Sequence, residues 1–155
     1  DIPHEEAAEI YDLRAAMDEL VGRRLAACIT PPQMKTLRAL VERMEQAVKA
    51  DDRDQYHLLN LQFHDRLVEF AGNRKMAAIY GKLVKELALY RRRNLVDGAV
   101  LPHSASEHRA ILKAIASGNS EQAGKVMYEH VIESKERALR AAAYPLSARA
   151  RAGRK

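Results

Sequence analysis

The most informative absences in this sequence are those of cysteine, tryptophan, glycine and proline. The 155 residues include one cysteine, no tryptophan, seven glycines and five prolines, and aromatic residues make up 5%. A lone cysteine cannot form a disulfide within the chain, which favours the reducing cytoplasm as its location. There is also no charged-then-apolar leader and no run of 18 apolar residues, so we predict neither a secretion signal nor a membrane-spanning helix. The scarcity of helix-breaking residues favours helices over a β-sandwich or barrel.

The net charge of +5 does not by itself indicate nucleic-acid binding. Four basic residues lie in the terminal stretch "SARARAGRK", which leaves 22 basic against 21 acidic residues in the rest of the chain. No zinc finger, aromatic RNA-binding motif or basic recognition helix accompanies them. The length suits a single domain with a hydrophobic core. We therefore predict one domain over residues 1–146 and a basic, disordered tail over residues 147–155.

Start and stop signals divide the chain into about six helices. Thr30 precedes two prolines that suit a helical first turn, and the "SASE" stretch from Ser104 reads as a capping box. The stretches "AGN" and "SGN" read as joints in which a glycine ends one helix and an asparagine caps the next. The helices are expected at about 5–28, 32–50, 52–71, 73–96, 104–117 and 119–143, with a loop over 97–103. The fold class is therefore an all-α antiparallel bundle.

Three of these helices place histidines on faces that should be buried. When each residue is turned by about 100° around the helix axis, Asn60, His64 and His57 fall on the apolar arc of the third helix. That arc is otherwise formed by Leu61, Leu67, Val68 and Ala71. His108 shares a face of the fifth helix with isoleucines and a leucine, and His130 aligns with the apolar residues of the sixth. We expect these histidines to meet in one core.

Buried histidines of this kind have several interpretations. A polar group left unpaired in an apolar medium costs about 1–3 kcal/mol, so each ring needs a partner. The simplest partner is a hydrogen bond in the core of a structural helical module. Asn60 and His64, one turn apart, can also bind one ion together with His108 and His130, because imidazole is a preferred ligand of zinc and related divalent ions. The positive end of the fifth helix should keep His108 neutral, as metal binding requires.

A three-histidine zinc site is also a catalytic arrangement, so a small metal-dependent hydrolase is an alternative. The residues argue against it. Glu107 points about 100° away from its neighbour His108, Asp65 lies on the solvent arc of its helix, and no "HExxH" motif, nucleophile elbow or glycine-rich phosphate loop is present. We therefore predict that the protein is not an enzyme.

Three stretches carry a resemblance to a known family. "NLQFHDRLVEFAGN", "SEHRAILKAIASGNSEQA" and "MYEHV" resemble the FCD domain, the ligand-binding C-terminal domain of FadR-like GntR transcription regulators. The resemblance implies a bundle of six or seven helices, usually a homodimer, that senses a small organic acid and controls an attached winged helix-turn-helix. It also implies metal ligands at His64, His108 and His130, with Asn60 where the family usually has aspartate. The neutral amide should hold a divalent cation more weakly and tolerate an anionic effector better.

The same resemblance sets the expected partners. The ion would be zinc, with nickel or manganese as alternatives, and a metal-free pocket that binds the effector directly is the other interpretation. The chain begins close to the first helix of the sensor domain, so we expect that DNA is bound only through a missing N-terminal domain. No membrane partner is expected.

Charges drawn toward the core indicate where a carboxylate effector would bind. Arg14 lies on the apolar stripe of the first helix and matches an arginine common in the family. Arg91 and Asn94 fall near the apolar face of the fourth helix, which includes Ile79, Leu83, Leu87 and Tyr90. A carboxylate that bridges the ion and an arginine would gain a bidentate, charge-assisted contact. An arginine near a helix end can instead extend to solvent, and Arg24 is a candidate for a dimer interface.

Overall fold

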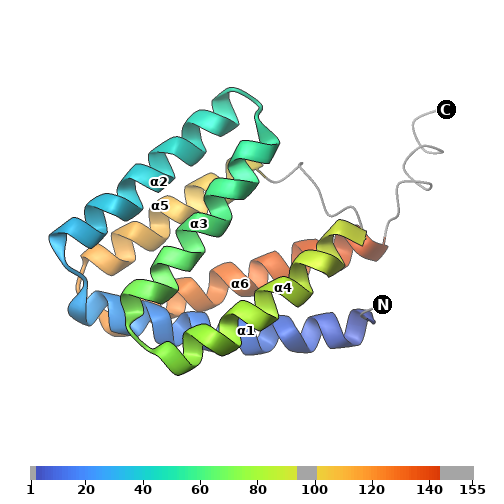
Figure 1. The fold of residues 1–155 in the computed structure, drawn as a ribbon, viewed down its shortest axis with the longest axis horizontal. Helices are drawn as coiled ribbons and strands as arrows, with labels where there is room; N and C mark the ends of the chain where they lie inside the picture. Colours follow the sequence, from blue (N-terminus) through green and yellow to red (C-terminus); the bar gives the residue numbers. More distant parts are fainter. Residues whose placement is uncertain (1–2, 94–100, 144–155) are drawn as a thin grey trace.

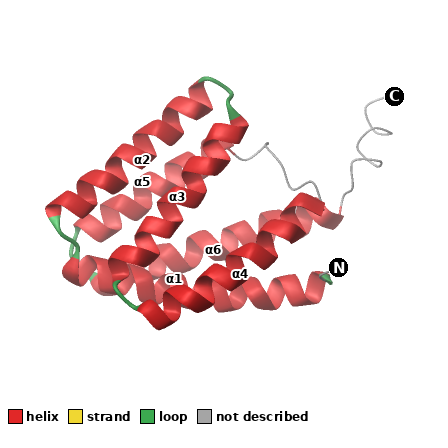
Figure 2. Ribbon diagram, viewed as in Figure 1, coloured by secondary structure: helices red, strands yellow, loops and turns green. Residues whose placement is uncertain are grey.

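The computed structural model describes residues 3–93 and 101–143, and all of the regular structure in these ranges is helical (Figures 1 and 2). The prediction of an all-α bundle is confirmed. The helices are α1 (His4–Cys28), α2 (Pro31–Lys49), α3 (Arg53–Ala71), α4 (Arg74–Arg93), α5 (Leu101–Ala116) and α6 (Ser120–Ala143). None of the described helices combines the length and apolar character needed to cross a membrane.

The predicted helix joints are confirmed by their backbone geometry. Gly72 and Gly118 have φ angles of 75° and 73°, a left-handed conformation that favours glycine. Asn73 and Asn119 follow them, and each side chain accepts a hydrogen bond at 3.0 Å from a backbone N–H three residues later. Thr30 forms a full capping box at the start of α2.

The predicted start of the fifth helix was wrong. The helix begins at Leu101, three residues before the expected cap at Ser104, because Pro102 is compatible with a helical first turn, where its missing N–H is not needed. The predicted end of the fourth helix near residue 96 lies outside the described residues, as does the predicted tail over 147–155.

The helices form two groups (Figure 1). α2 packs against α3 and α5, while α1 packs against both α4 and α6, most extensively on α6. Two glycines allow this close approach of α1 and α6. A Cβ atom at Gly22 would lie 2.5 Å from the carbonyl oxygen of Ala123, and one at Gly124 would lie 3.1 Å from that of Glu19.

The apolar core is divided into two clusters with polar groups between them. The larger cluster includes Val21 and Leu25 of α1 and Met127 of α6. The smaller cluster includes Tyr11 of α1 and Val131 of α6. Along α1, the buried Asp18 falls between the buried residues of the two clusters, and the buried Arg14 lies one turn earlier, among those of the smaller cluster. Along α6, His130 falls between Met127 of the larger cluster and Val131 of the smaller one. The sequence thus builds a buried polar layer where the two cores meet.

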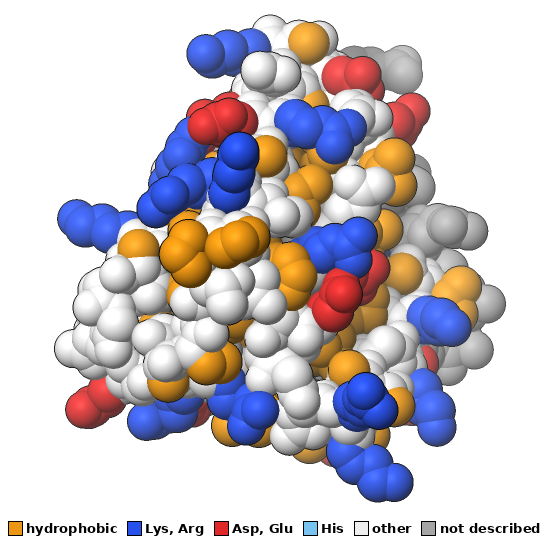
Figure 3. All heavy atoms as spheres, turned by 60° about the vertical axis from the view of Figure 1, so that its left-hand side comes forward, with side chains coloured by type: hydrophobic (Ala, Val, Ile, Leu, Met, Phe, Trp, Pro, Cys, Tyr) orange, Lys and Arg blue, Asp and Glu red, His pale blue; other side chains and the backbone are white. Residues whose placement is uncertain are grey.

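Some residues expected on buried faces are exposed. Leu61 is 48% exposed and Ile79 is 52% exposed, and His57 and Cys28 also lie on the surface. Leu61 and Ile79 lie at the margins of their apolar arcs, and the helical wheel does not show how widely neighbouring helices cover a face. On the face drawn in Figure 3, basic side chains are spread among apolar and acidic ones and are not gathered into one patch.

Candidate metal and effector site

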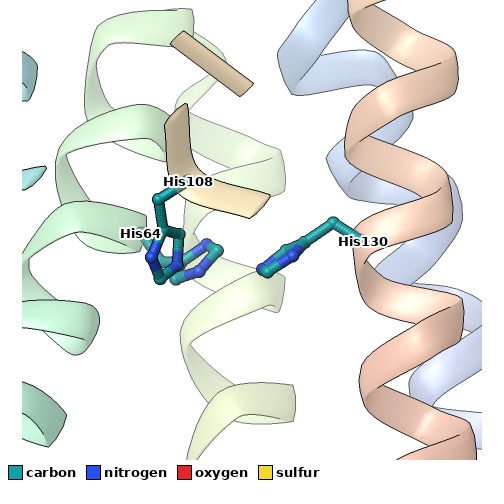
Figure 4. A group of neighbouring side chains, drawn as sticks. All are labelled: His64, His108 and His130. Atoms are coloured by element: carbon teal, nitrogen blue, oxygen red, sulfur yellow. The ribbon is translucent and has the colours of Figure 1, made fainter. Parts of the chain in front are cut away.

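Three helices bring His64, His108 and His130 together in the polar layer (Figure 4). His64 comes from α3, His108 from α5 and His130 from α6, and their relative exposures are 6%, 1% and 7%. Each ring offers a nitrogen such that the three atoms all lie within 4.8 Å of one another. The rings of His64 and His130 stack with centroids 5.4 Å apart. The cluster could hold a metal ion after small side-chain movements, since zinc–nitrogen distances are about 2.0–2.1 Å.

The hydrogen bonding of the cluster fits a metal ligand set. Within residues 3–93 and 101–143, neither ring nitrogen of His108 has a hydrogen-bond partner, and neither does His64 Nδ1. A neutral imidazole has one donor and one acceptor, so the buried His108 leaves both unused. Such groups cost about 1–3 kcal/mol each when nothing binds them. A bound cation would remove part of this cost, whereas ordinary core packing would not.

The electrostatic environment keeps two of the three histidines, His64 and His108, neutral. Burial, followed by the charge of His130, lowers the pKa of His108 to about 3. Burial also holds the pKa of His64 well below its usual range, and the charges of Arg14 and His130 add to this effect. Neutral imidazoles keep the lone pair that a cation needs. The expectation of a neutral His108 agrees with this finding, but burial and not the helix dipole is its main cause, since α5 starts earlier than expected.

Glu107 orients the ring of His130 through a hydrogen bond to one of its two nitrogens, Nδ1. The Nδ1–H of His130 donates to Glu107 Oε2 at 2.7 Å, which directs Nε2 away from the carboxylate. Arg137 donates to both oxygens of the same carboxylate, at 2.8 Å and 3.2 Å. Burial alone would raise the pKa of Glu107, but the hydrogen bonds from His130 and Arg137 hold it well below its usual range. A carboxylate behind a histidine ligand is a common feature of metal sites.

Asn60 lies one helical turn before His64 on α3. Its Oδ1 atom is shielded from solvent and has no hydrogen-bond partner among the described residues. Like several of the histidine nitrogens, this amide oxygen lacks a hydrogen-bond partner within the described residues, and its role as a fourth ligand stays a prediction. His57, another turn earlier, is exposed and does not belong to the cluster.

Arg14 is buried on α1, where it contacts Tyr80 and Asp18. Its Nε–H donates to the Tyr80 hydroxyl at 3.2 Å, and Nε lies 3.7 Å from Asp18 Oδ2. Burial by itself lowers the pKa of Arg14, but Tyr80 and Asp18 more than offset this effect and raise it, so the guanidinium stays charged. Arg14 does not extend to solvent, which was the alternative interpretation of its position.

Arg91 is half-buried on α4, and its Nε–H donates to the Tyr11 hydroxyl at 2.9 Å. After burial, the charges of Arg14 and Arg91 both contribute to holding the pKa of His64 below its usual range. Asn94, the third predicted effector residue, lies outside the described residues. Arg24 donates Nε–H to the Ala71 carbonyl at 2.5 Å, so it has a partner within the chain at the end of α3.

Sequence reasoning missed the residues that hold the site in place: Tyr11, Asp18, Tyr80 and Glu107. Tyr80 and Tyr11 lie on apolar faces, where they read as ordinary core residues. Glu107 was interpreted as pointing away from the site, and it does face away from its neighbour His108, but it reaches α6. Only the packing of α5 against α6 reveals that contact. Because Glu107 is engaged by His130 and Arg137, it is not available as a general base, which argues further against a hydrolase.

Comparisons with known proteins agree with the fold and with the family resemblance of the sequence. The family model described as the FCD domain matches residues 9–133. The gluconate operon transcriptional repressor of Bacillus subtilis (strain 168) is 28% identical over 76 residues, which are 49% of this chain and 31% of that protein. The solved structure of Streptococcus agalactiae GntR matches with a TM-score of 0.73 and 26% identity, over 84% of this chain and 58% of that one. The chain thus spans under a third of the curated relative and just over half of the solved one.

Proposed function

The chain belongs to the FCD domain family, and on this premise we propose that it senses a small carboxylate for a GntR-type transcription regulator. The observation that supports this proposal most strongly is the buried cluster of His64, His108 and His130, several of whose nitrogens have no partner among the described residues. The similar proteins are transcription regulators, which agrees with a regulatory role and not with an enzyme.

We propose that the three histidines and Asn60 hold a divalent ion, with zinc as the first candidate and nickel or manganese as alternatives. When bound, such an ion would act as a Lewis acid toward an effector carboxylate. Three nitrogen donors and one neutral oxygen leave the charge of the ion uncompensated by its ligands. An anionic effector is therefore favoured at this position, whereas the tightness of ion binding is reduced.

Arg14 is the first candidate for binding the effector carboxylate. It is buried and remains charged, and its charge contributes to lowering the pKa of His64. A carboxylate between the histidine cluster and this guanidinium would accept charge-assisted hydrogen bonds in a site sheltered from water. Arg91 is the second candidate, from the facing helix α4.

The site can influence an attached domain because five helices contribute to it. α3, α5 and α6 supply the histidines, and α1 and α4 supply the arginines. An effector that binds better to one arrangement of these helices stabilises that arrangement, which constitutes a coupling free energy between two sites. We propose that the chain forms a homodimer and that the change is transmitted to N-terminal DNA-binding domains, whose spacing determines operator recognition.

Elemental analysis and thermal melting test this function together. The purified chain should contain about one divalent ion per protomer, as expected for a four-ligand site, and lose it in the His64→Ala variant. Small carboxylates should raise the melting temperature of the metal-bound protein. His57→Ala is the matched control, because it removes an exposed histidine from the same helix and should change neither result. Equal metal content and equal ligand response in the wild type and His64→Ala would contradict the proposal.

A further inference from the structure

Two arginine–tyrosine contacts cross between α1 and α4. Arg14 of α1 donates to Tyr80 of α4, and Arg91 of α4 donates to Tyr11 of α1. In each pair the guanidinium carbon also lies near the ring, 5.7 Å and 5.8 Å from its centroid. Both contacts use Nε, so each arginine is held at the Nε end of its planar guanidinium group. The two terminal nitrogens at the other end are called the fork below. Anchoring of this kind fixes the direction of the two terminal nitrogens.

The terminal nitrogens of both forks are unused. Among the described residues, no side-chain or backbone oxygen accepts a hydrogen bond from the terminal nitrogens of Arg14 or Arg91. Paired terminal N–H groups match the two oxygens of a carboxylate. Tyr11 and Arg14 lie one helical turn apart on α1, so the two contacts hold both guanidinium groups against the same stretch of α1.

The charges of the polar layer do not balance. Asp18 supplies at most one negative charge, and it is paired with Arg14. Glu107 is already matched by Arg137. Arg91 has no acidic partner among the described residues. Within residues 3–93 and 101–143, one positive charge of the layer therefore remains without a counter-charge before any cation binds. A divalent ion on histidines and a neutral amide would add two more.

We propose that the effector is a dicarboxylate, with one carboxylate at Arg14 and the histidine cluster and the second at Arg91. A monocarboxylate would leave the Arg91 fork without a partner and the positive charge of the layer largely uncompensated. Tyr11 and Tyr80 act as positioning residues, because each holds a fork by Nε without competing for the donors that the ligand needs. This inference rests on the proposed carboxylate-sensing function and adds the number and placement of the anionic groups.

Matched ligand pairs test the proposal by titration calorimetry on the zinc-loaded 155-residue chain at constant ionic strength. Succinate is compared with butyrate, and malate with 2-hydroxybutyrate, because the members of each pair differ only in the second carboxylate. We expect the dicarboxylate to bind about 10- to 100-fold more tightly in each pair, the range typical of a hydrogen-bonded contact with a charged group.

Variants locate the second carboxylate. Arg91→Gln should reduce the preference for the dicarboxylate to within about threefold, because the contact with Arg91 is expected to provide most of the 10- to 100-fold difference in affinity. Tyr11→Phe should weaken dicarboxylate binding and leave monocarboxylate binding nearly unchanged, because it frees the Arg91 fork without removing its charge. Arg66→Gln is the control for general charge loss, since Arg66 is exposed on α3 and pairs with Glu69.

The outcomes separate this inference from the proposed function. Equal affinities within each ligand pair in the wild type would overturn the dicarboxylate proposal while leaving a monocarboxylate sensor in place. A preference that persists in Arg91→Gln, or that falls equally in Arg66→Gln, would also overturn it. Failure of every carboxylate to bind the zinc-loaded wild type would overturn the sensing function itself. The wild-type comparison decides the matter even if a variant fails to fold.

Discussion

Replacement of Glu107 by glutamine tests whether the carboxylate behind His130 supports metal binding. The substitution keeps the shape and one acceptor oxygen, but it removes the negative charge that accepts the 2.7 Å hydrogen bond from His130 Nδ1–H. It also leaves Arg137 without the carboxylate that it contacts through two nitrogens. His130 then becomes a poorer electron donor at Nε2, and its ring is held less firmly.

The magnitude follows from these contacts. Loss of the outer partner of a metal-bound histidine typically costs 10- to 100-fold in metal affinity, or about 1.4–2.8 kcal/mol. The Glu107 side chain is 11% exposed, so solvent screens the contact only weakly. We therefore expect zinc affinity to fall by about 10- to 100-fold, while His130→Ala, which removes the ligand itself, should cost more.

Competition with a chromophoric chelator measures the zinc affinity, and the absorption spectrum of the cobalt-substituted protein reports the ligand geometry. Glu45→Gln is the control, because Glu45 forms a similar two-contact pair with Arg109 on the surface. It should change neither readout. Unchanged zinc affinity in Glu107→Gln, or equal losses in both variants, would refute the reasoning.

Three further predictions concern the ligand set, the pH dependence and the helix packing. Asn60→Asp should raise zinc affinity at least about tenfold, as a carboxylate replaces a neutral oxygen, and weaken carboxylate binding; unchanged chelator competition would contradict this. The unfolded chain protonates His64 and His108 near pH 6.5 whereas the folded chain keeps them neutral to much lower pH, to about 3 for His108. The free energy of unfolding of the metal-free protein should thus be at its maximum above pH 6.5 and fall by up to about 1.4 kcal/mol per pH unit per histidine below it. An unfolding free energy, measured in urea, that stays constant between pH 6.5 and 5 would be inconsistent with buried neutral rings. Gly22→Ala should destabilise the fold by about 1–3 kcal/mol, because its Cβ would lie 2.5 Å from the Ala123 carbonyl oxygen; a melting temperature equal to that of Gly81→Ala, where nothing lies within 4 Å, would disprove it.

The helix joints could be predicted from the sequence because their causes are local. Gly72 and Gly118 adopt positive φ angles within their own turns, and the asparagines that follow bond within three residues. The start of α5 could not be predicted in the same way, because proline at position 102 is compatible with both a loop and a first helical turn. The exposure of Leu61 depends on which neighbours cover α3, and periodicity within one helix does not contain that information.

The histidine cluster could also be predicted from the sequence, but for a different reason. Helical periodicity placed His64, His108 and His130 on three apolar faces, and short connections left few ways to arrange those faces. Periodicity gives a direction around an axis but not the partner that a side chain meets. The contact of Glu107 with His130 and the anchoring of Arg14 by Tyr80 depend on the offset between neighbouring helices, so only the folded structure could show them.

If the chain binds the proposed ion and carboxylate, the polar layer is the place where they would act on helices that are otherwise closely packed. Apolar contacts hold α1 against α6 on both sides of the layer, where a displaced side chain would lose packing. Within the layer, no group in the described part of the chain pairs with the nitrogens of His108 or accepts from the terminal nitrogens of Arg14 and Arg91, so a single tight arrangement is not favoured there. A cation and an anion would supply the missing partners from outside the chain. Both ligands would contact several helices at once. If they bind one arrangement of these helices more tightly than another, the difference in binding free energy shifts the population toward the first arrangement.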